Sequence, residues 1–131
     1  MNGDSPERAF REAESWLASA KHGLMVDDEA SSNVACAQAI HAIIRANDAL
    51  SLKFLGHKPT RHDDAAIVYA KFAREGKLPV GAERFKNLVA DAMRDKSGAD
   101  YGKSSFTCEN AQEYAEKAGE FLAMVKSVLK L

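Results

Sequence analysis

SSNVACAQAIHAIIRANDALSLKFL, residues 31–55, is the stretch whose pattern decides the fold of this chain. At 100° per residue, its apolar side chains fall on two opposite sides of a helix. Between these sides runs a ridge of small residues, formed by Ala35, Ala42, Ala46 and Ala49. A helix that is apolar on two sides is enclosed by its neighbours rather than lying on a surface. The stretch therefore predicts a surrounded, central helix that ends at Gly56 with a left-handed cap.

The N-terminal segment has the signature of a helix start. Asp4, Ser5, Pro6 and Glu7 supply a capping side chain, a proline at the first helical position and an acid near the positive end of the helix dipole. Apolar residues then recur at helical spacing. Trp16 is one of them, and it is expected to pack in the core.

Three further helices are predicted after Gly56. Pro59 and Thr60 open the third, residues 85–93 carry the apolar face of the fourth, and Thr107 caps the last after a polar stretch at about 95–105. The last helix also carries glutamates that are expected to form a solvated face, namely Glu109, Glu113, Glu116 and Glu120. Because no segment alternates with period two, the sequence predicts an all-α fold. The expected architecture is an antiparallel up-and-down bundle of four to five helices in one domain, residues 1–131, with its core from about residue 6.

Composition and charge exclude several classes of function. The chain has 131 residues and a mass of 14.2 kDa, with 18 basic and 19 acidic side chains and a net charge of −1. This balance provides no bulk positive field that would hold a polyanion without specificity. No apolar run is long enough to span a membrane and no secretory signal is recognisable, so a cytoplasmic protein is expected. Cys36 and Cys108 are expected to be free thiols, and no metal or cofactor motif occurs.

Polar residues interrupt the apolar pattern of the central helix. His41, Arg45 and Asp48 are spaced i, i+4, i+7 and follow one line, which Gln38 extends towards the N-terminus. An arginine in an enclosed setting needs an anion, because an unpaired charge there is strongly penalised. Two readings follow. Either Asp48 neutralises Arg45 in a self-contained pair beside His41, or Arg45 faces a polar pocket and receives a phosphate or another anion.

Four segments together are similar to a known family. They are AESWLASAKHGL in the first helix, QAIHAIIRANDALSLKFLG in the second, residues 59–62 at the opening of the third, and TCENAQEYAEKAGEFLAMVKSVL after Tyr101 and Gly102. Over about residues 6–131 their order resembles the HEPN domain (higher eukaryotes and prokaryotes nucleotide-binding). The resemblance implies a compact antiparallel helical bundle and a homodimer. For many members it also implies a small nucleotidyltransferase as partner in a two-gene toxin–antitoxin module.

The resemblance does not carry over the family's common activity. Many members are metal-independent ribonucleases that use an Arg, four to six intervening residues and a His at a dimer cleft. No Arg of this sequence is followed by a His at that spacing. Two positions do match the family, His62 at the start of the third helix and Tyr101 before the last helix. Lys103 lies close to the start of that last helix, where anions are favoured. The predicted ligand contacts are therefore Gln38, His41, Arg45, Asp48, His62, Tyr101 and Lys103.

The sequence thus predicts a HEPN-like dimeric binding module that engages a nucleotide, RNA or a nucleotidyltransferase partner. Two alternatives stay open. One is a divergent metal-independent ribonuclease, in which His41 and Arg45, the only close His–Arg pair on one helical face, would act on RNA. The other is a purely structural interaction protein, in which the pair of Arg45 and Asp48 only fixes the register of the helices.

Overall fold

The computed structural model of the chain describes residues 4–26, 28–59, 64–100 and 108–131. Every secondary-structure element in these ranges is helical. The elements are α1 (Pro6–Gly23), α2 (Glu29–Leu55), α3 (Ala65–Arg74), the short 3-10 helix η2 (Ala82–Phe85), α4 (Lys86–Asp100) and α5 (Cys108–Leu129). The predicted all-α helical bundle is confirmed.

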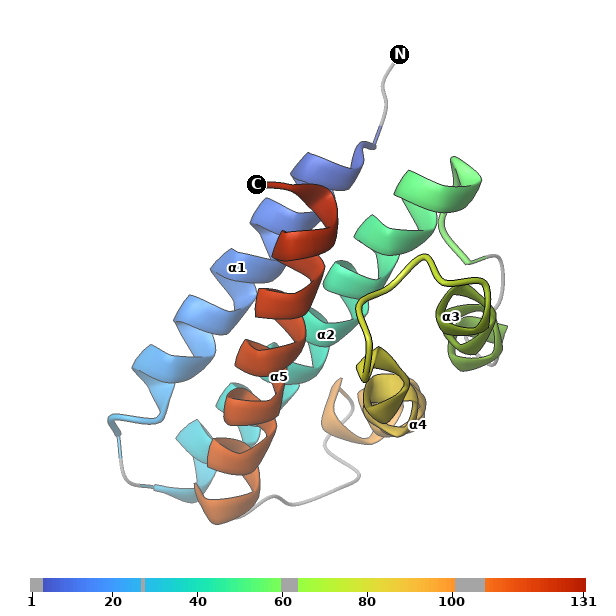
Figure 1. Ribbon diagram of the computed structural model, residues 1–131. Coiled ribbons are helices and arrows are strands. Elements are labelled where there is room, and N and C mark those ends of the chain that lie inside the picture. Colours follow the sequence, from blue (N-terminus) through green and yellow to red (C-terminus); the bar gives the residue numbers. More distant parts are fainter. Residues whose placement is uncertain (1–3, 27, 60–63, 101–107) are drawn as a thin grey trace.

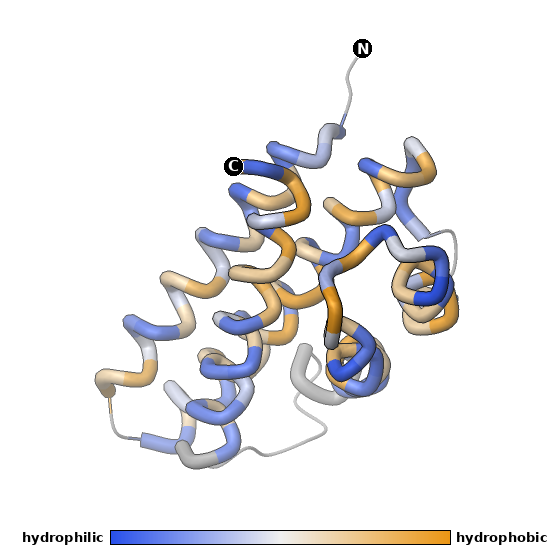
Figure 2. Tube along the Cα trace, viewed as in Figure 1, coloured by the Kyte–Doolittle hydropathy of each residue, from blue (hydrophilic) through white to orange (hydrophobic). Residues whose placement is uncertain are grey.

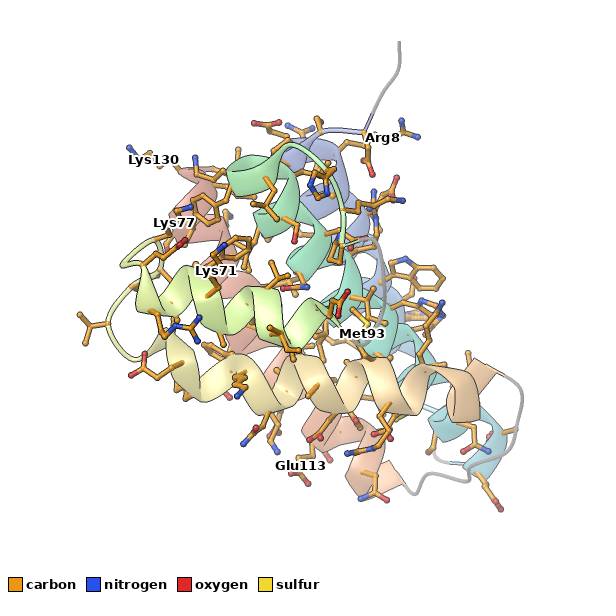
Figure 3. All side chains as sticks on the ribbon, turned by 90° about the vertical axis from the view of Figure 1, so that its right-hand side faces the viewer. Arg8, Lys71, Lys77, Met93, Glu113 and Lys130 are labelled. Atoms are coloured by element: carbon orange, nitrogen blue, oxygen red, sulfur yellow. The ribbon has the colours of Figure 1, made fainter. Side chains whose placement is uncertain are left out.

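Three long helices form the body of the molecule (Figure 1). Helix α1 runs antiparallel to α2 and to α5, and the described N-terminal residues and the C-terminus lie at the same end. Helices α3 and α4 cross this body. They are seen nearly end-on in Figure 1, where the three long helices are seen lengthwise, and side by side in Figure 3. Helix α2 contacts the four other α-helices, most extensively α1 and α5. It is therefore the central helix that the sequence predicts.

Both ends of α2 follow from local chemistry. Asp28 is the N-cap, and its Oδ1 accepts a hydrogen bond of 2.7 Å from the backbone N–H of Ser31. The helix consequently begins at Glu29, two residues before the start expected from the apolar pattern. At the other end Gly56 has φ of 82°, a left-handed conformation that glycine adopts without strain. The predicted C-cap at Gly56 is confirmed.

Helix α4 is longer than the apolar pattern indicates. The sequence places a polar stretch from about residue 95, whereas α4 continues to Asp100. Polar contacts support the turn in which this polar stretch begins: Arg94 forms ion pairs with Asp91 at 3.0 Å and with Asp95 at 3.1 Å. The hydroxyl of Tyr114 on α5 also donates a hydrogen bond to Asp95. Such side-chain pairs support a helical turn without apolar residues.

Helix α3 begins at Ala65, later than the opening expected at Pro59 and Thr60. Residues 60–63 lie outside the described residues, and so does the expected cap Thr107. The last helix does follow at Cys108. On its surface Glu113, Glu116 and Glu120 are exposed as predicted, while the side chain of Glu109 lies outside the description.

Buried alanines line the contacts among the long helices. On these three helices the alanines that are at most 3% exposed are Ala9, Ala13 and Ala20 on α1, Ala35, Ala39, Ala42, Ala46 and Ala49 on α2, and Ala111, Ala115 and Ala118 on α5. Small side chains let helix axes approach closely, and a Cβ built on Gly23 would lie 3.5 Å from the Cβ of Ala35. Hydrophobic and hydrophilic residues succeed one another along each helix in Figure 2, as amphipathic packing requires. The alanine ridge predicted on the central helix is therefore a packing surface.

Larger side chains fill the space between the long helices and the crossing pair. Tyr69 on α3 and Phe121 on α5 are fully buried, with ring centroids 5.8 Å apart. The hydroxyl of Tyr69 donates a hydrogen bond of 2.6 Å to the backbone carbonyl of Ala82, so this buried polar group is paired. Cys36 is buried and unlinked. Among the described residues no helix is both long and apolar enough to cross a membrane.

Replacing Ala42 by leucine should lower the free energy of unfolding by about 2 kcal/mol, because a close-packed helix contact must shift to admit the larger side chain. Ala123, exposed on α5, is the matched control. Its replacement by leucine should change the free energy by less than about 0.5 kcal/mol. Urea unfolding measures both. An equally small effect at both positions would show that the alanines do not set the helix distances.

Candidate functional site

The guanidinium of Arg45 joins the middle of α2 to the start of α1. Its Nε donates to Glu12 Oε1 at 2.9 Å, and its Nη2 donates to Asp4 Oδ1 at 3.0 Å. Its Nη1 donates to Asp4 Oδ2 at 3.2 Å and to Asp48 Oδ2 at 3.0 Å. We call Arg45, Asp4, Glu12 and Asp48 the Arg45 cluster. These bonds occupy four of the five N–H donors of the guanidinium.

Burial makes this cluster consequential for stability. The side chain of Arg45 is 16% exposed and that of Asp48 is 12% exposed. Burial lowers the pKa of Arg45, but hydrogen bonds with Asp4 and Asp48 outweigh burial and raise it overall. Burial raises the pKa of Asp48, against the effect of its hydrogen bond with Arg45. The hydrogen bond from Arg45 holds the pKa of Asp4 below its ordinary value. Arg45 is therefore a permanent cation that is hydrogen-bonded to three carboxylates.

The charge of the Arg45 cluster opposes an anion that approaches Arg45 itself. One cation and three carboxylates sum to −2, and most donors of Arg45 are already engaged. A phosphate at Arg45 would have to displace Asp4 or Glu12 and would face the remaining carboxylates. The geometry therefore favours the reading in which carboxylates of the chain itself satisfy Arg45. It extends the expected pair with Asp48 to two further acids, Asp4 just before α1 and Glu12 on α1.

Trp16 is not a core residue, contrary to the prediction. Its side chain lies at the edge of the buried stripe of α1 and is 38% exposed. The indole stacks on the imidazole of His41 on α2, with ring centroids 4.7 Å apart and an interplanar angle of 24°. The physical reason lies in helix geometry. Ala13, Leu17 and Ala20 already define the buried face, and residue 16 is rotated by 100° from residue 17. Trp16 belongs to the apolar pattern of the first helix, but on α2 it contacts His41 at the surface rather than the buried core.

Two shallow grooves flank this aromatic pair. The first, which we call the Trp16 groove, has a volume of about 540 Å³ and is lined by Arg8, Arg11, Glu12, Ser15, Trp16 and Ser19. The second, the hairpin groove, has a volume of about 740 Å³ and is lined by Ala18, Ser19, His22, Gly23, Ala30, Ser31, Val34 and Gln38. Ser19 lines both grooves. The α1–α2 face thus carries a hollowed surface that runs along α1 on both sides of Ser19.

The structure brings part of the predicted site together. Gln38 lines the hairpin groove and His41 stacks on Trp16. Arg45 and Asp48 are paired in the Arg45 cluster. The other three predicted contacts, His62, Tyr101 and Lys103, lie outside the described residues. The described part of the site is therefore the α1–α2 face.

Sequence reasoning missed two members of the Arg45 cluster, Asp4 and Glu12. A signal exists, because residues 8 and 12 share one side of the first helix and residue 4 precedes its start at the same four-residue spacing. That spacing predicts a polar stripe, but it does not show which neighbouring helix the stripe meets. In the part of the chain that the structure describes, no three His, Cys, Asp or Glu side chains are grouped so that they could hold a metal ion.

A comparison with protein families matches residues 6–128 of the chain to the HEPN domain. The chain belongs to the HEPN domain family. The match covers nearly the whole chain and confirms the resemblance seen in the sequence. No curated protein matches the chain. Membership supports a helical module associated with nucleotides or RNA, since HEPN domains often bind nucleic acid. HEPN domains also often dimerise.

Removing the cation from the cluster should destabilise this HEPN domain strongly. Arg45→Met should lower the free energy of unfolding by about 3 kcal/mol, because Asp48 is left buried without its partner. Adding Asp48→Leu should restore most of that loss, since no unpaired charge then remains under the surface. Urea unfolding of both variants and of Asp48→Leu alone measures the coupling. A double variant no more stable than Arg45→Met would contradict the cluster.

The contribution of Asp4 should depend on pH in a defined direction. Because its folded pKa is depressed below the ordinary value of 3.8, the carboxylate stabilises the fold above that value, and the contribution disappears as the pH falls through the folded pKa. At neutral pH, Asp4→Asn should cost about 0.5–1 kcal/mol, a modest value because the pair is partly exposed. Glu14→Gln, a change at an exposed carboxylate of α1, is the control. A cost for Asp4→Asn that does not shrink as the pH is lowered below 3.8 would contradict this assignment.

Proposed function

We propose that this HEPN domain is a non-catalytic binding module that engages a nucleotide or RNA through its α1–α2 face. Gln38 and His41 contact the ligand, while Arg45 and Asp48 hold α1 against α2 below them. His62, Tyr101 and Lys103 complete the proposed set of contacts. A cytoplasmic location stays a prediction.

The observation that carries this proposal is the half-exposed stack of Trp16 on His41 between two grooves. An indole with a partly open surface is a platform on which a nucleobase can stack. Gln38, in the adjoining groove, offers both an amide donor and an acceptor to a base edge. Family membership points to the same ligand class.

Arg45 favours the binding module over the divergent ribonuclease. A metal-free ribonuclease needs a cation directed at the phosphorane and a histidine near the 2′-hydroxyl. Here the guanidinium donates to Asp4, Glu12 and Asp48. The sequence also lacks the Arg–x4–6–His motif of the family's ribonucleases. Both features support binding without cleavage.

The proposal includes two protein partners. One is a second copy of the chain, since HEPN domains often dimerise. The other is a small nucleotidyltransferase in a toxin–antitoxin-like pair, as the family resemblance implies. A purely structural role for the chain is the competing function, and binding measurements separate it from the proposed one.

Titration calorimetry with mononucleotides and short RNAs tests the proposal. We expect binding, and we expect Gln38→Ala and His41→Ala each to weaken it about fivefold or more, the equivalent of about one lost hydrogen bond or stacking contact. Gln112→Ala, an exposed change on α5, is the matched control and should bind normally. The same RNAs, incubated with the protein in chelator, should stay intact. Heat-silent titrations with every ligand, confirmed by a second binding assay, would overturn the proposal.

A further inference from the structure

We infer that the Trp16 groove is a site for single-stranded nucleic acid, with one base stacked on Trp16 and neighbouring phosphates on Arg11 and Arg8. The inference rests on the proposed function and names its substrate class. It distinguishes an extended single strand from a free mononucleotide and from a duplex. Arg8, Arg11 and Trp16 are absent from the contacts that the sequence predicts.

Trp16 supplies the stacking platform. Its ring is backed by His41 at 4.7 Å, yet 38% of the residue is exposed. Because His41 supports the indole from α2, the platform is held in place before a ligand arrives, which reduces the ordering cost of binding. Every nucleobase has an aromatic face, so stacking of this kind tolerates any sequence. In a duplex the bases are already stacked on one another, and they are not available to Trp16.

Arg11 supplies an available positive charge. It lines the Trp16 groove, and none of the described carboxylates forms an ion pair with it. Arg8, at the edge of the molecule in Figure 3, is paired only weakly with Glu12, at 3.5 Å and with a 65% exposed side chain. Glu12 also accepts the hydrogen bond from Arg45, so its charge is shared between two arginines. The lining of the groove therefore carries two arginines and one carboxylate, and Arg11, unlike Arg8, forms no ion pair with the described carboxylates.

The polar side chains along α1 extend over a length that suits a strand of several nucleotides better than a single nucleotide. Arg8, Arg11, Ser15, Ser19 and His22 recur every three to four residues and so follow one side of the helix. At 1.5 Å per residue, Arg8 and His22 are about 21 Å apart along the axis. Ser19 links the Trp16 groove to the hairpin groove. A strand with a base on Trp16 can extend along this path, whereas a mononucleotide reaches one part of it.

Trp16 is the only tryptophan of the chain, so intrinsic fluorescence reports directly on this site. The test titrates the full chain with short single-stranded oligoadenylate, with the same strand in a duplex, and with adenosine monophosphate. Fluorescence of Trp16 and anisotropy of a labelled strand are followed together. We expect the single strand to quench Trp16 and to bind at least tenfold more tightly than the duplex or the mononucleotide.

Variants separate stacking from charge. Trp16→Ala should weaken binding of the single strand about tenfold or more, and Trp16→Phe should recover part of that loss. Arg11→Ala should weaken binding and lower the salt slope by about 0.7, the value for one phosphate contact on a single strand. Arg74→Ala removes an exposed arginine of α3 and should leave binding unchanged. Ser15→Glu adds a carboxylate to the groove without removing a contact, and it should also weaken binding, which keeps the test valid even if Trp16→Ala fails to fold.

Three results would overturn the inference. If the single strand binds without changing Trp16 fluorescence and the variants bind normally, the ligand lies elsewhere, and the proposed function survives alone. If neither nucleotides nor RNA bind, both the inference and the proposed function fail. If Trp16 emission depends on protein concentration, light scattering shows self-association, and RNA does not compete, this face is an interface between copies of the chain.

Discussion

One guanidinium fixes the position of the first helix on the central one. Arg45 sits in the middle of α2, where most neighbouring positions are buried, and a charge there is tolerated only if it is paired. Two of its three partners lie on the chain of the first helix: Asp4 just before α1 and Glu12 within it. The contacts are directional, because the planar fork of an arginine donates its hydrogen bonds to carboxylates only along defined directions. Alanine packing lets the two helices approach, and the Arg45 cluster selects one register among those that the alanines would allow.

The same register determines what the surface presents. Glu12 and Trp16 are one turn apart on α1, as are Arg45 and His41 on α2, so the ion pair and the aromatic stack are consecutive contacts of one helix pair. With α1 held in this way, Trp16 rests on His41 while part of its ring stays accessible. Carboxylates of the chain neutralise Arg45, whereas Arg11 lines the Trp16 groove and is available to a ligand. The buried arginine thus contributes to a binding surface without touching a ligand.

Much of the fold could be predicted from the sequence, because it rests on local signals. Ser5 with Pro6, and Gly56, are capping residues whose effect depends on the nearest turn alone. The two apolar sides of residues 31–55 require neighbours whatever their identity. The C-terminal extent of α4 was missed because its last residues form a polar stretch without an apolar pattern, and only the turn at which that stretch begins has ion pairs, those of Arg94.

The site was only partly predictable, because its contacts join different helices. His41, Arg45 and Asp48 could be placed on one line of α2, but the acids that reach Arg45 depend on the rotation of α1 about its axis. The same rotation decides whether Trp16 meets the core or the surface. A hydrophobic pattern fixes such a rotation to within roughly one residue position, about 100°, and Trp16 lies at that boundary. Only the packed structure distinguishes a core indole from a stacking platform.

The most direct measurement of the link between the Arg45 cluster and this surface is the NMR shift of the His41 ring protons. In the native chain, stacking on Trp16 should move these signals upfield from their free values. Asp4→Asn combined with Glu12→Gln removes the ties to α1 and leaves Asp48 in place. The signals should then return towards their free values while the remainder of the spectrum stays folded. Unchanged His41 shifts in that variant would show that the aromatic face forms without the cluster.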